Sequence, residues 1–590
     1  MVEVGKTAEE REEARIGLLT FIAGIIGFAA GIIAFILYHL IGFLTNLFFY
    51  QKLDFSFASP QYNHLGLLVI LIPAFGGLIA GLMIKYGSTR IIGHGIPEAI
   101  ESVLLGKSKI EPKVGVLKAL SAAFTIGSGQ PFGAEGPIIQ TGGSFGSLIG
   151  QLISVTGSER RILLSCGAAA GMAATFGTPI SAVFLVIELL LFEFRVKSLV
   201  PVAIASAIGA WMHIYLISPK PLFSTPIYSF GGLNTLPFYV ALGLLSGLTG
   251  SALSRGLYKT EDLFRKLPLG QPWLPTLGGL AVGVIGFLVP QVLGVGYDVI
   301  SSLIGSKVTL EIALLILVAK ALAWVLAMGS QTSGGTLAPL FMIGSALGLI
   351  FGTGVVAAFP GLGVVPGVFA IAAMAAVFGT ASRAPFASIV FALEVTQAYQ
   401  GVLPVIVTVV IAELVGEYLM ADSIMTEKLA RRGLRVRHIY EFNPLRQTRV
   451  SSIMSPVIAV DAKERVMDVF RLMNLPDHHF AKRKRLVVLE DGIAAGMIDR
   501  SQLFREASKA DAELTVGQVA SKSFLTIRED EFGFEALRLM TLNNVPFLVV
   551  VDKNNKAVGY FSRGDMIKAQ KDKIADDTIV EKGIWARLFK

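Results

Sequence analysis

Cysteine and charged residues are both scarce in this chain of 590 residues. The single cysteine, Cys166, excludes an internal disulfide bond and a cysteine-based metal cluster. Charged residues make up only 16% of the sequence, whereas soluble globular proteins carry about 25%. This shortage of charge, together with 53% hydrophobic residues, excludes an ordinary soluble protein and indicates a membrane protein.

The sequence also lacks the residue patterns of common hydrolases and cation sites. It has no HExxH motif, no defensible Ser/His/Asp constellation and few titratable groups in its apolar segments, which argues against an intramembrane enzyme. The clustered carboxylates that a divalent cation requires are missing as well, so no metal site is expected. The net charge of +8 is explained by basic residues after the last apolar segment, and we expect no nucleic-acid partner.

Long apolar segments fill the first 420 residues or so. A transmembrane helix needs roughly 20 mainly apolar residues, and the segment 16–50 exceeds this length. Other segments come close to it: 65–84, 199–217, 274–295 and 310–328. The chain is therefore predicted to be a multi-pass membrane protein in contact with lipid. Residues 1–15 mix acids and bases, unlike a signal peptide, and predict an N-terminal cytoplasmic tail that is not cleaved.

The membrane region repeats itself. Ala173–Glu188 resembles Ala375–Glu394, and Pro137 lies 202 residues before Pro339. Weak internal symmetry, with glycine- and proline-broken segments at matching positions, indicates a transport site at the interface of the repeats. We therefore predict a transmembrane domain of residues 16–425 that contains two related halves, 16–215 and 230–425.

Composition changes near residue 425, and the tail contains a second repeat. The segment that starts at Gly496 matches the segment that starts at Gly559, 63 residues later. Two α/β units of about sixty residues are expected to pack together. The predicted parts are a basic linker (426–445), a first unit (446–508), a second unit (511–573) and a C-terminal tail (574–590). The basic residues that follow the last apolar segment predict that the tail is cytoplasmic.

Three breaks rich in glycine and proline interrupt the apolar region. They are GHGIPE at Gly93–Glu98, GAEGP at Gly133–Pro137 and GGTLAP at Gly334–Pro339. Glycine permits unusual backbone dihedrals and proline suits the first turn of a helix, so each break is predicted to start a helix at membrane depth. A helix start exposes free N–H groups and about half a positive charge. Several such ends converging on one point would bind an anion weakly enough for rapid passage.

The order of these three motifs, followed by the paired tail units, resembles the CLC family of chloride channels and chloride/proton exchangers. The tail resembles that family's paired CBS domains. The resemblance spans about residues 16 to 570. It implies a polytopic all-α membrane domain with inverted internal repeats and many broken or tilted helices, followed by an α/β CBS-domain pair. It also implies a homodimer in the cell membrane, with a separate pore for chloride or another small anion in each subunit.

By this resemblance Glu135 is the gating glutamate, whose carboxylate occupies an anion position and swings away to let chloride pass. Protonation should release Glu135 as well. An ionised glutamate at mid-membrane costs about 2.5–3.5 kcal/mol or more unless it is compensated, and helix starts supply that compensation. A structural acid bonded to backbone amides is the alternative. The expected anion-binding positions are Gly93, His94, Gly95, Ile96, Pro97, Gly133, Ala134, Glu135, Gly136, Pro137, Gly335, Thr336, Leu337, Ala338 and Met425.

The sequence departs from the family pattern at four of these positions. His94 replaces a serine whose hydroxyl contacts the central anion in the family; its imidazole could donate a hydrogen bond, attract the anion when charged, or turn away while the amides bind. Met425 replaces the expected pore tyrosine, Ala134 the usual arginine and Leu337 the usual phenylalanine. These changes leave open a preference for fluoride, nitrate or another small anion.

Leu189 bears on the choice between a channel and an exchanger. Exchangers of the family usually carry a proton-handling glutamate at this position, and leucine cannot carry a proton. The preceding Glu188 has a matching acid, Glu394, in the second repeat, which favours a shared structural role over a proton relay. The sequence therefore favours passive conduction, with a chloride/proton antiporter as the alternative. Lys320, in an apolar stretch, is expected to face the protein interior rather than lipid.

CBS pairs commonly bind adenine nucleotides, and one copy here keeps the signature. Ser562 and Asp565 match the Ser/Thr-x-x-Asp pattern for ribose and phosphate, whereas the first copy has Asp499 and Gln502. ATP, ADP or AMP at Ser562 and Asp565 is one expectation, and a structural or dimerising role for the pair is the other. No cofactor is expected to be required, and no enzymatic activity is expected. A nucleotide sensor with a passive membrane anchor is disfavoured, because an anchor needs only intact helices.

Overall fold

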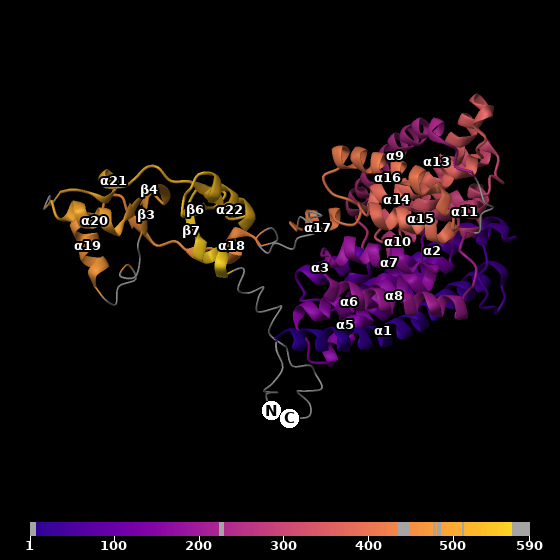
Figure 1. Cartoon of the computed structure of the whole chain (residues 1–590), viewed down its shortest axis with the longest axis horizontal. Helices are drawn as coiled ribbons and strands as arrows, with labels where there is room; N and C mark the ends of the chain where they lie inside the picture. The colour runs from indigo at the N-terminus through magenta and orange to yellow at the C-terminus, as the bar shows by residue number, and fades with distance from the viewer. Residues whose placement is uncertain are drawn as a thin grey trace. The chain divides into compact units, whose positions relative to one another are not determined.

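The protein is represented by a computed structural model that describes residues 8–223, 229–434, 445, 448–475, 480, 485–509 and 513–568. The chain divides into two compact units, with the boundary between Glu441 and Phe442 (Figure 1). The first unit contains the apolar segments, and the second contains the tail repeats.

The first unit is all helical, and its two halves have the same order of helices. The first half contains α1 (Ala8–Thr45), α2 (Leu71–Tyr86), α3 (Ile96–Leu104), α4 (Pro112–Gly127), α5 (Glu135–Leu152), α6 (Gly157–Phe176), α7 (Pro179–Val186) and α8 (Val196–Leu216). The second half contains α9 (Leu236–Arg265), α10 (Trp273–Leu288), α11 (Tyr297–Ile304), α12 (Leu310–Gly329), α13 (Leu337–Ala358), α14 (Pro366–Ser382), α15 (Pro385–Thr396) and α16 (Val402–Leu419). A short helix, α17 (Glu427–Arg431), follows. The helices of the second half thus follow one another in the same order as those of the first.

Several of these helices are suited to a bilayer. Among the described residues, seven helices are long and apolar enough to cross a membrane, and four shorter apolar helices accompany them. The helices α6 and α14 carry mostly small residues, are buried along nearly their whole length, and let neighbouring backbones approach closely. The chain is a multi-pass membrane protein in which broken helices lie among full-length ones.

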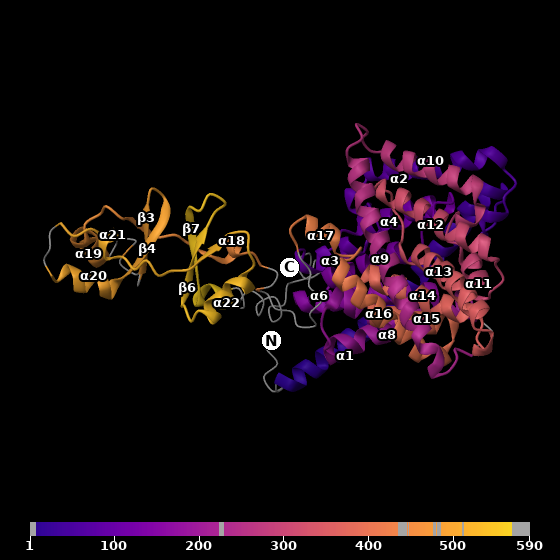
Figure 2. The same ribbon diagram turned by 90° about the horizontal axis from the view of Figure 1, so that it is seen from above.

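The two halves pack against each other through matching helices. In Figure 1, α1, α5, α6 and α8 lie together, and α9, α13, α14 and α16 form the other group. Figure 2 shows α2 beside α10, and the contacts agree. The pair α7 and α15 makes a second connection between the halves. The interface therefore lies between corresponding elements of the repeat.

The second unit contains two copies of one α/β motif. The first copy has β2 (Ala459–Asp461), α19 (Val466–Asn474), β3 (Arg485–Glu490), β4 (Ile493–Asp499) and α20 (Arg500–Ala507). The second has α21 (Val516–Val519), β5 (Thr526–Arg528), α22 (Gly533–Leu542), β6 (Phe547–Val551) and β7 (Ala557–Ser562). A short helix, α18 (Val450–Ile453), and the strand β1 (Ser455–Pro456) come before both copies in the chain. In each copy the first strand runs parallel to the second, which pairs antiparallel with the third.

The apolar strands β3 and β6 lie at the centre of the second unit. Leu486 and Val488 of β3 pack into the core of their own copy. Val487, which points to the opposite face of the strand, packs with Val549 and Val551 of β6 in a shared core. Both faces of each strand are buried, which explains why these sequences are continuously apolar rather than alternating.

Candidate functional site

The three glycine and proline breaks start helices, as the sequence predicts. The helix α3 begins at Ile96 after Gly95, which has a positive φ of 90°. The helix α5 begins at Glu135, and α13 begins at Leu337. Pro97, Pro137 and Pro339 lie in the first turn of these helices, where the missing amide hydrogen has no cost.

The breaks are bonded directly to one another through their backbones. Gly93 N donates to Thr332 O at 2.8 Å, and Gly334 N donates to Gly93 O at 3.2 Å. Gly133 and Gly335 exchange both hydrogen bonds, at 2.9 and 3.3 Å. These bonds join segments that are about 200 residues apart in the chain, so the predicted convergence of the three helix starts is present in the fold.

Glycine is needed here because the loops approach one another closely. A Cβ atom on Gly136 would lie 2.1 Å from the carbonyl oxygen of His94, and one on Gly335 would lie 2.4 Å from that of Gly133. Both distances are far below van der Waals contact, so no side chain fits at either position.

Polar side chains of α4 bind the carbonyl groups of the breaks. The Lys118 ammonium, whose residue is 0% exposed, donates to Ile91 O at 2.9 Å and to Gly93 O. Thr125 Oγ1 donates to Ser333 O at 2.7 Å, and Ser121 Oγ donates to Ser333 Oγ. These side chains of α4 donate hydrogen bonds to oxygen atoms of the breaks. They leave the N–H groups of the helix starts available to another acceptor. Sequence reasoning missed Lys118, although its offset of 202 residues from Lys320 matches the repeat.

The carboxylate of Glu135 is bound at the start of α13. Its Oε1 accepts hydrogen bonds from Leu337 N and, at 3.4 Å, from Ala338 N. Its Oε2 is buried and has no hydrogen-bond partner among the described residues. The side chain therefore places a negative charge against the positive end of a helix from the other half of the repeat.

The sequence reasoning also missed a buried tyrosine with an unbonded hydroxyl. Tyr297, the first residue of α11, is packed against the rings of Phe57, Phe176 and Phe223. Its buried hydroxyl has no hydrogen-bond partner in the described part of the chain. No pattern in the sequence marks this position, because it depends on how α11 packs against α13 and α14.

His94, in the first break, lies next to the segment that carries Met425. His94 is 5% exposed, and its Nε2 lies 3.3 Å from the carbonyl oxygen of Ile424, the residue before Met425. The Tyr258 hydroxyl donates to the same oxygen at 2.7 Å. Met425 is fully buried. Met425 itself supplies no hydroxyl. The hydroxyl of Tyr258 of α9 lies next to this position, but it is bonded to a backbone carbonyl.

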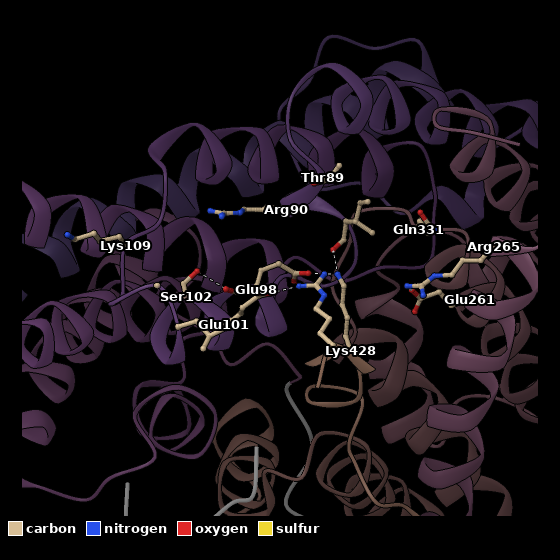
Figure 3. A pocket seen from close by; sticks show the side chains of 14 residues that line it. Thr89, Arg90, Glu98, Glu101, Ser102, Lys109, Glu261, Arg265, Gln331 and Lys428 are labelled. Carbon is tan, nitrogen blue, oxygen red and sulfur yellow. Dashed lines mark hydrogen bonds and ion pairs between the residues drawn. The ribbon is translucent and has the colours of Figure 1, made fainter. Parts of the chain in front are cut away.

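A polar cavity of about 570 Å³ reaches the first break (Figure 3). Its lining includes three acids and five bases: Glu98, Glu101, Glu261, Arg90, Lys109, Arg265, Lys428 and Arg432. Lys428 pairs with Glu98 and also donates to Ile92 O at 3.2 Å. The cavity therefore borders the first break at Ile92 and Glu98, and its lining has an excess of positive charge.

The two matching acids of the repeat cap each other's helices. Glu188 accepts from Phe386 N and Ala387 N at the start of α15. Glu394 accepts from Ile180 N and Ser181 N at the start of α7. This reciprocal arrangement fits the predicted structural role.

Two further predicted positions lie inside the protein. Leu189 is buried. Lys320 is also buried and donates to Val292 O and Gly294 O, both at 2.9 Å, so it faces the protein and not lipid.

In the second unit, Ser562 and Asp565 form a helix cap. Asp565 accepts from Ser562 N and Ser562 Oγ, as in a capping box. It also accepts from Ser455 Oγ of β1 at 2.7 Å. The carboxylate that would accept ribose hydroxyls is therefore already bonded to three donors of the protein. A separate cavity of about 190 Å³ lies between the two copies, lined by Asp499 and Gln502 of the first and by Ser521, Phe524 and Phe547 of the second, among others.

Comparison with known proteins agrees with this architecture. The profile of the voltage gated chloride channel family matches residues 76–417, more than half of the chain, and that of the CBS domain matches residues 516–572. A ClcB-like protein of Ralstonia nicotianae is 30% identical over 366 residues, which cover 61% of this chain and 85% of the relative. The H(+)/Cl(-) exchange transporter ClcA of Citrobacter koseri is 30% identical over 376 residues, covering 62% and 78%.

A solved structure supports the same assignment. A slow cyanobacterial Cl-/H+ antiporter aligns with a TM-score of 0.60 at 25% identity, covering 72% of this chain and 98% of that one. The family match, the relatives and the convergent helix starts lead to one conclusion: the chain belongs to the voltage gated chloride channel (CLC) family and carries a C-terminal CBS domain region.

Proposed function

We propose that this protein moves chloride or another small anion across the membrane, and that Glu135 gates the passage. The observation that carries the proposal is the binding of the Glu135 carboxylate by the first amides of α13. A site that binds a carboxylate through backbone N–H groups can bind a halide in the same way, because both are monovalent anions. The two compete for the same donors, which makes the glutamate a gate.

The surroundings of the site favour anions over cations. Three helix starts contribute partial positive charge, and the buried Lys118 adds a full one next to the first break. The polar cavity that borders this loop has more bases than acids. No bare carboxylate cluster is present among the described residues that line it, since Glu98 is paired with Lys428.

Anion flux from vesicles tests this function. The full chain, reconstituted with a chloride gradient and a potassium ionophore, is expected to release chloride. Acidification is expected to speed release, because protonating Glu135 removes the charge that holds it on the α13 amides. In Glu135→Gln the pH dependence due to this group should disappear. Absence of flux of chloride, fluoride and nitrate in the wild type at every pH and potential would contradict the function.

Chloride/proton exchange is a second candidate function. It is favoured by the similarity to ClcA of Citrobacter koseri, which is an H(+)/Cl(-) exchange transporter by name. The inner proton-handling position is Leu189, and Glu188 is engaged in capping α15, so exchange would need another inner group. The vesicle assay decides: uphill proton movement driven by a chloride gradient supports exchange, and its absence supports passive conduction.

We also propose that the protein is a homodimer in the cell membrane with its CBS region in the cytoplasm. Lys428, Arg431 and Arg432 follow the last apolar helix, as expected for a cytoplasmic end. Cross-linking in native membranes tests the dimer, and protease access to the tail in sealed vesicles tests the orientation. For the CBS region we propose that an adenine nucleotide reaches Asp565 only by displacing Ser455.

A further inference from the structure

The hydrogen bond of His94 determines which of its ring nitrogens carries hydrogen. A carbonyl oxygen can only accept, so the Nε2 atom that lies 3.3 Å from Ile424 O must be the donor. In a neutral imidazole the other nitrogen, Nδ1, is then a bare lone pair. Nδ1 is buried and has no hydrogen-bond partner among the described residues, as expected where no donor faces it.

A neutral His94 therefore cannot bind an anion through its side chain. A lone pair repels a halide, whereas the N–H of a protonated ring attracts it. Protonation changes Nδ1 into a donor and leaves the bond to Ile424 O in place. A side-chain hydroxyl can donate at any pH, but this histidine can donate at Nδ1 only after it takes up a proton.

We propose that His94 is a proton-linked anion ligand: an anion that binds beside the first break is bound together with one proton on His94 Nδ1. This inference rests on the proposed transport function and adds to it a titratable group distinct from Glu135. It also supplies an inner proton-binding residue in a chain where Leu189 cannot serve as one.

The charged groups around His94 leave room for an anion as its partner. On α3, the helix that follows His94, Glu98 is engaged by Lys428 of α17. From α4, Lys118 adds a second positive charge: it donates to Gly93 O, and Lys428 donates to Ile92 O, so both lysines are bonded within two residues of His94. From α9, Tyr258 donates to the same carbonyl as His94 and brings no charge. With two cations and one acid nearby, the proton on His94 requires an added negative charge, which a bound anion provides.

Chloride binding to the purified full chain tests this proposal. The measurement is titration calorimetry between pH 4.5 and 8 in buffers of different ionisation enthalpy, which counts the protons taken up per chloride bound. A Glu135→Gln background removes the proton of the gate. We expect the uptake to approach one proton per chloride bound. In the pH range where this uptake occurs, the affinity for chloride should rise about tenfold for each unit by which the pH falls.

Two variants of His94 and one control complete the experiment. In His94→Asn and His94→Ser, whose side chains donate at any pH, chloride should bind without proton uptake and with nearly constant affinity. His39→Gln, which removes an imidazole bonded to Phe35 O on α1, should behave like the parent. Chloride binding without proton uptake in the parent, or equal uptake in the His94 variants, overturns this inference alone. No chloride binding at any pH overturns the proposed function as well.

Discussion

Glu135 is held by two amides of another helix, and this explains how a charged side chain is kept at a buried position. Its Oε1 is bonded to Leu337 N and Ala338 N, while its Oε2 has no partner among the described residues. A carboxylate held on one side only can leave without breaking a wider network. The contact depends on Gly133 and Gly335, whose mutual hydrogen bonds bring α5 and α13 together.

A substitution of Gly335 tests this dependence. Gly335→Ala would place a Cβ atom 2.4 Å from Gly133 O and 2.6 Å from Glu135 Oε1. Overpacking of this kind costs about 1–3 kcal/mol, so we expect a lower thermal unfolding temperature in detergent and slower anion flux. Gly354→Ala, on the α13 helix that follows Gly335 but with no atom from elsewhere in the chain within 4 Å of the added methyl, is the control and should match the wild type. Normal flux in Gly335→Ala would show that the close approach is not required.

Residue patterns predicted the helix starts, including the one at Glu135, but not the contacts that surround them. The motifs around Gly95, Glu135 and Leu337 are local signals that can be read directly from the sequence. The hydrogen bonds of Tyr258 and Lys118 to distant carbonyls are not local, because they depend on how α9 and α4 pack against the loops. Asp565 could have been recognised as part of a capping box from its spacing to Ser562.

At the scale of elements, the repeat is stabilised by exchange of caps between its halves. The helices α7 and α15 pack together, and each ends near a glutamate that accepts two amides at the start of the other. The first amides of a helix have no partner within the helix, and in a bilayer water cannot replace one. The paired acids therefore satisfy both helix starts without external donors or acceptors.

The symmetry of this arrangement gives a testable expectation. Glu188→Ala and Glu394→Ala should each lower stability by about 1 kcal/mol, the usual cost of losing a helix cap, and thermal unfolding in detergent should show similar shifts. Glu417→Ala, at an exposed position of α16, serves as the control. If Glu188 were a proton relay, its variant would abolish proton coupling whereas the Glu394 variant would not. Equal behaviour of the two in a proton-flux assay supports the structural role.

At the scale of the whole molecule, every residue placed at the anion site lies in the first unit, and the nucleotide signature lies in the second. A nucleotide effect on transport must therefore originate at the CBS region. There the signature carboxylate of Asp565 is held by Ser455 and Ser562. A ribose hydroxyl that takes the position of the Ser455 hydroxyl on Asp565 Oδ1 must displace it, so β1 competes with the nucleotide at this atom.

Removal of the Ser455 hydroxyl should therefore strengthen nucleotide binding. A net hydrogen bond to a charged group is worth about 1.5–3 kcal/mol, so we expect Ser455→Ala in the full chain to bind a fluorescent ATP analogue at least about tenfold more tightly. Asp565→Asn should weaken the binding. Ser452→Ala, which removes an exposed hydroxyl bonded to Arg449 O, should leave the affinity unchanged. If ATP, ADP and AMP fail to bind to both the wild type and Ser455→Ala, the Ser562 and Asp565 pair serves only as a helix cap, and the CBS region has a structural role.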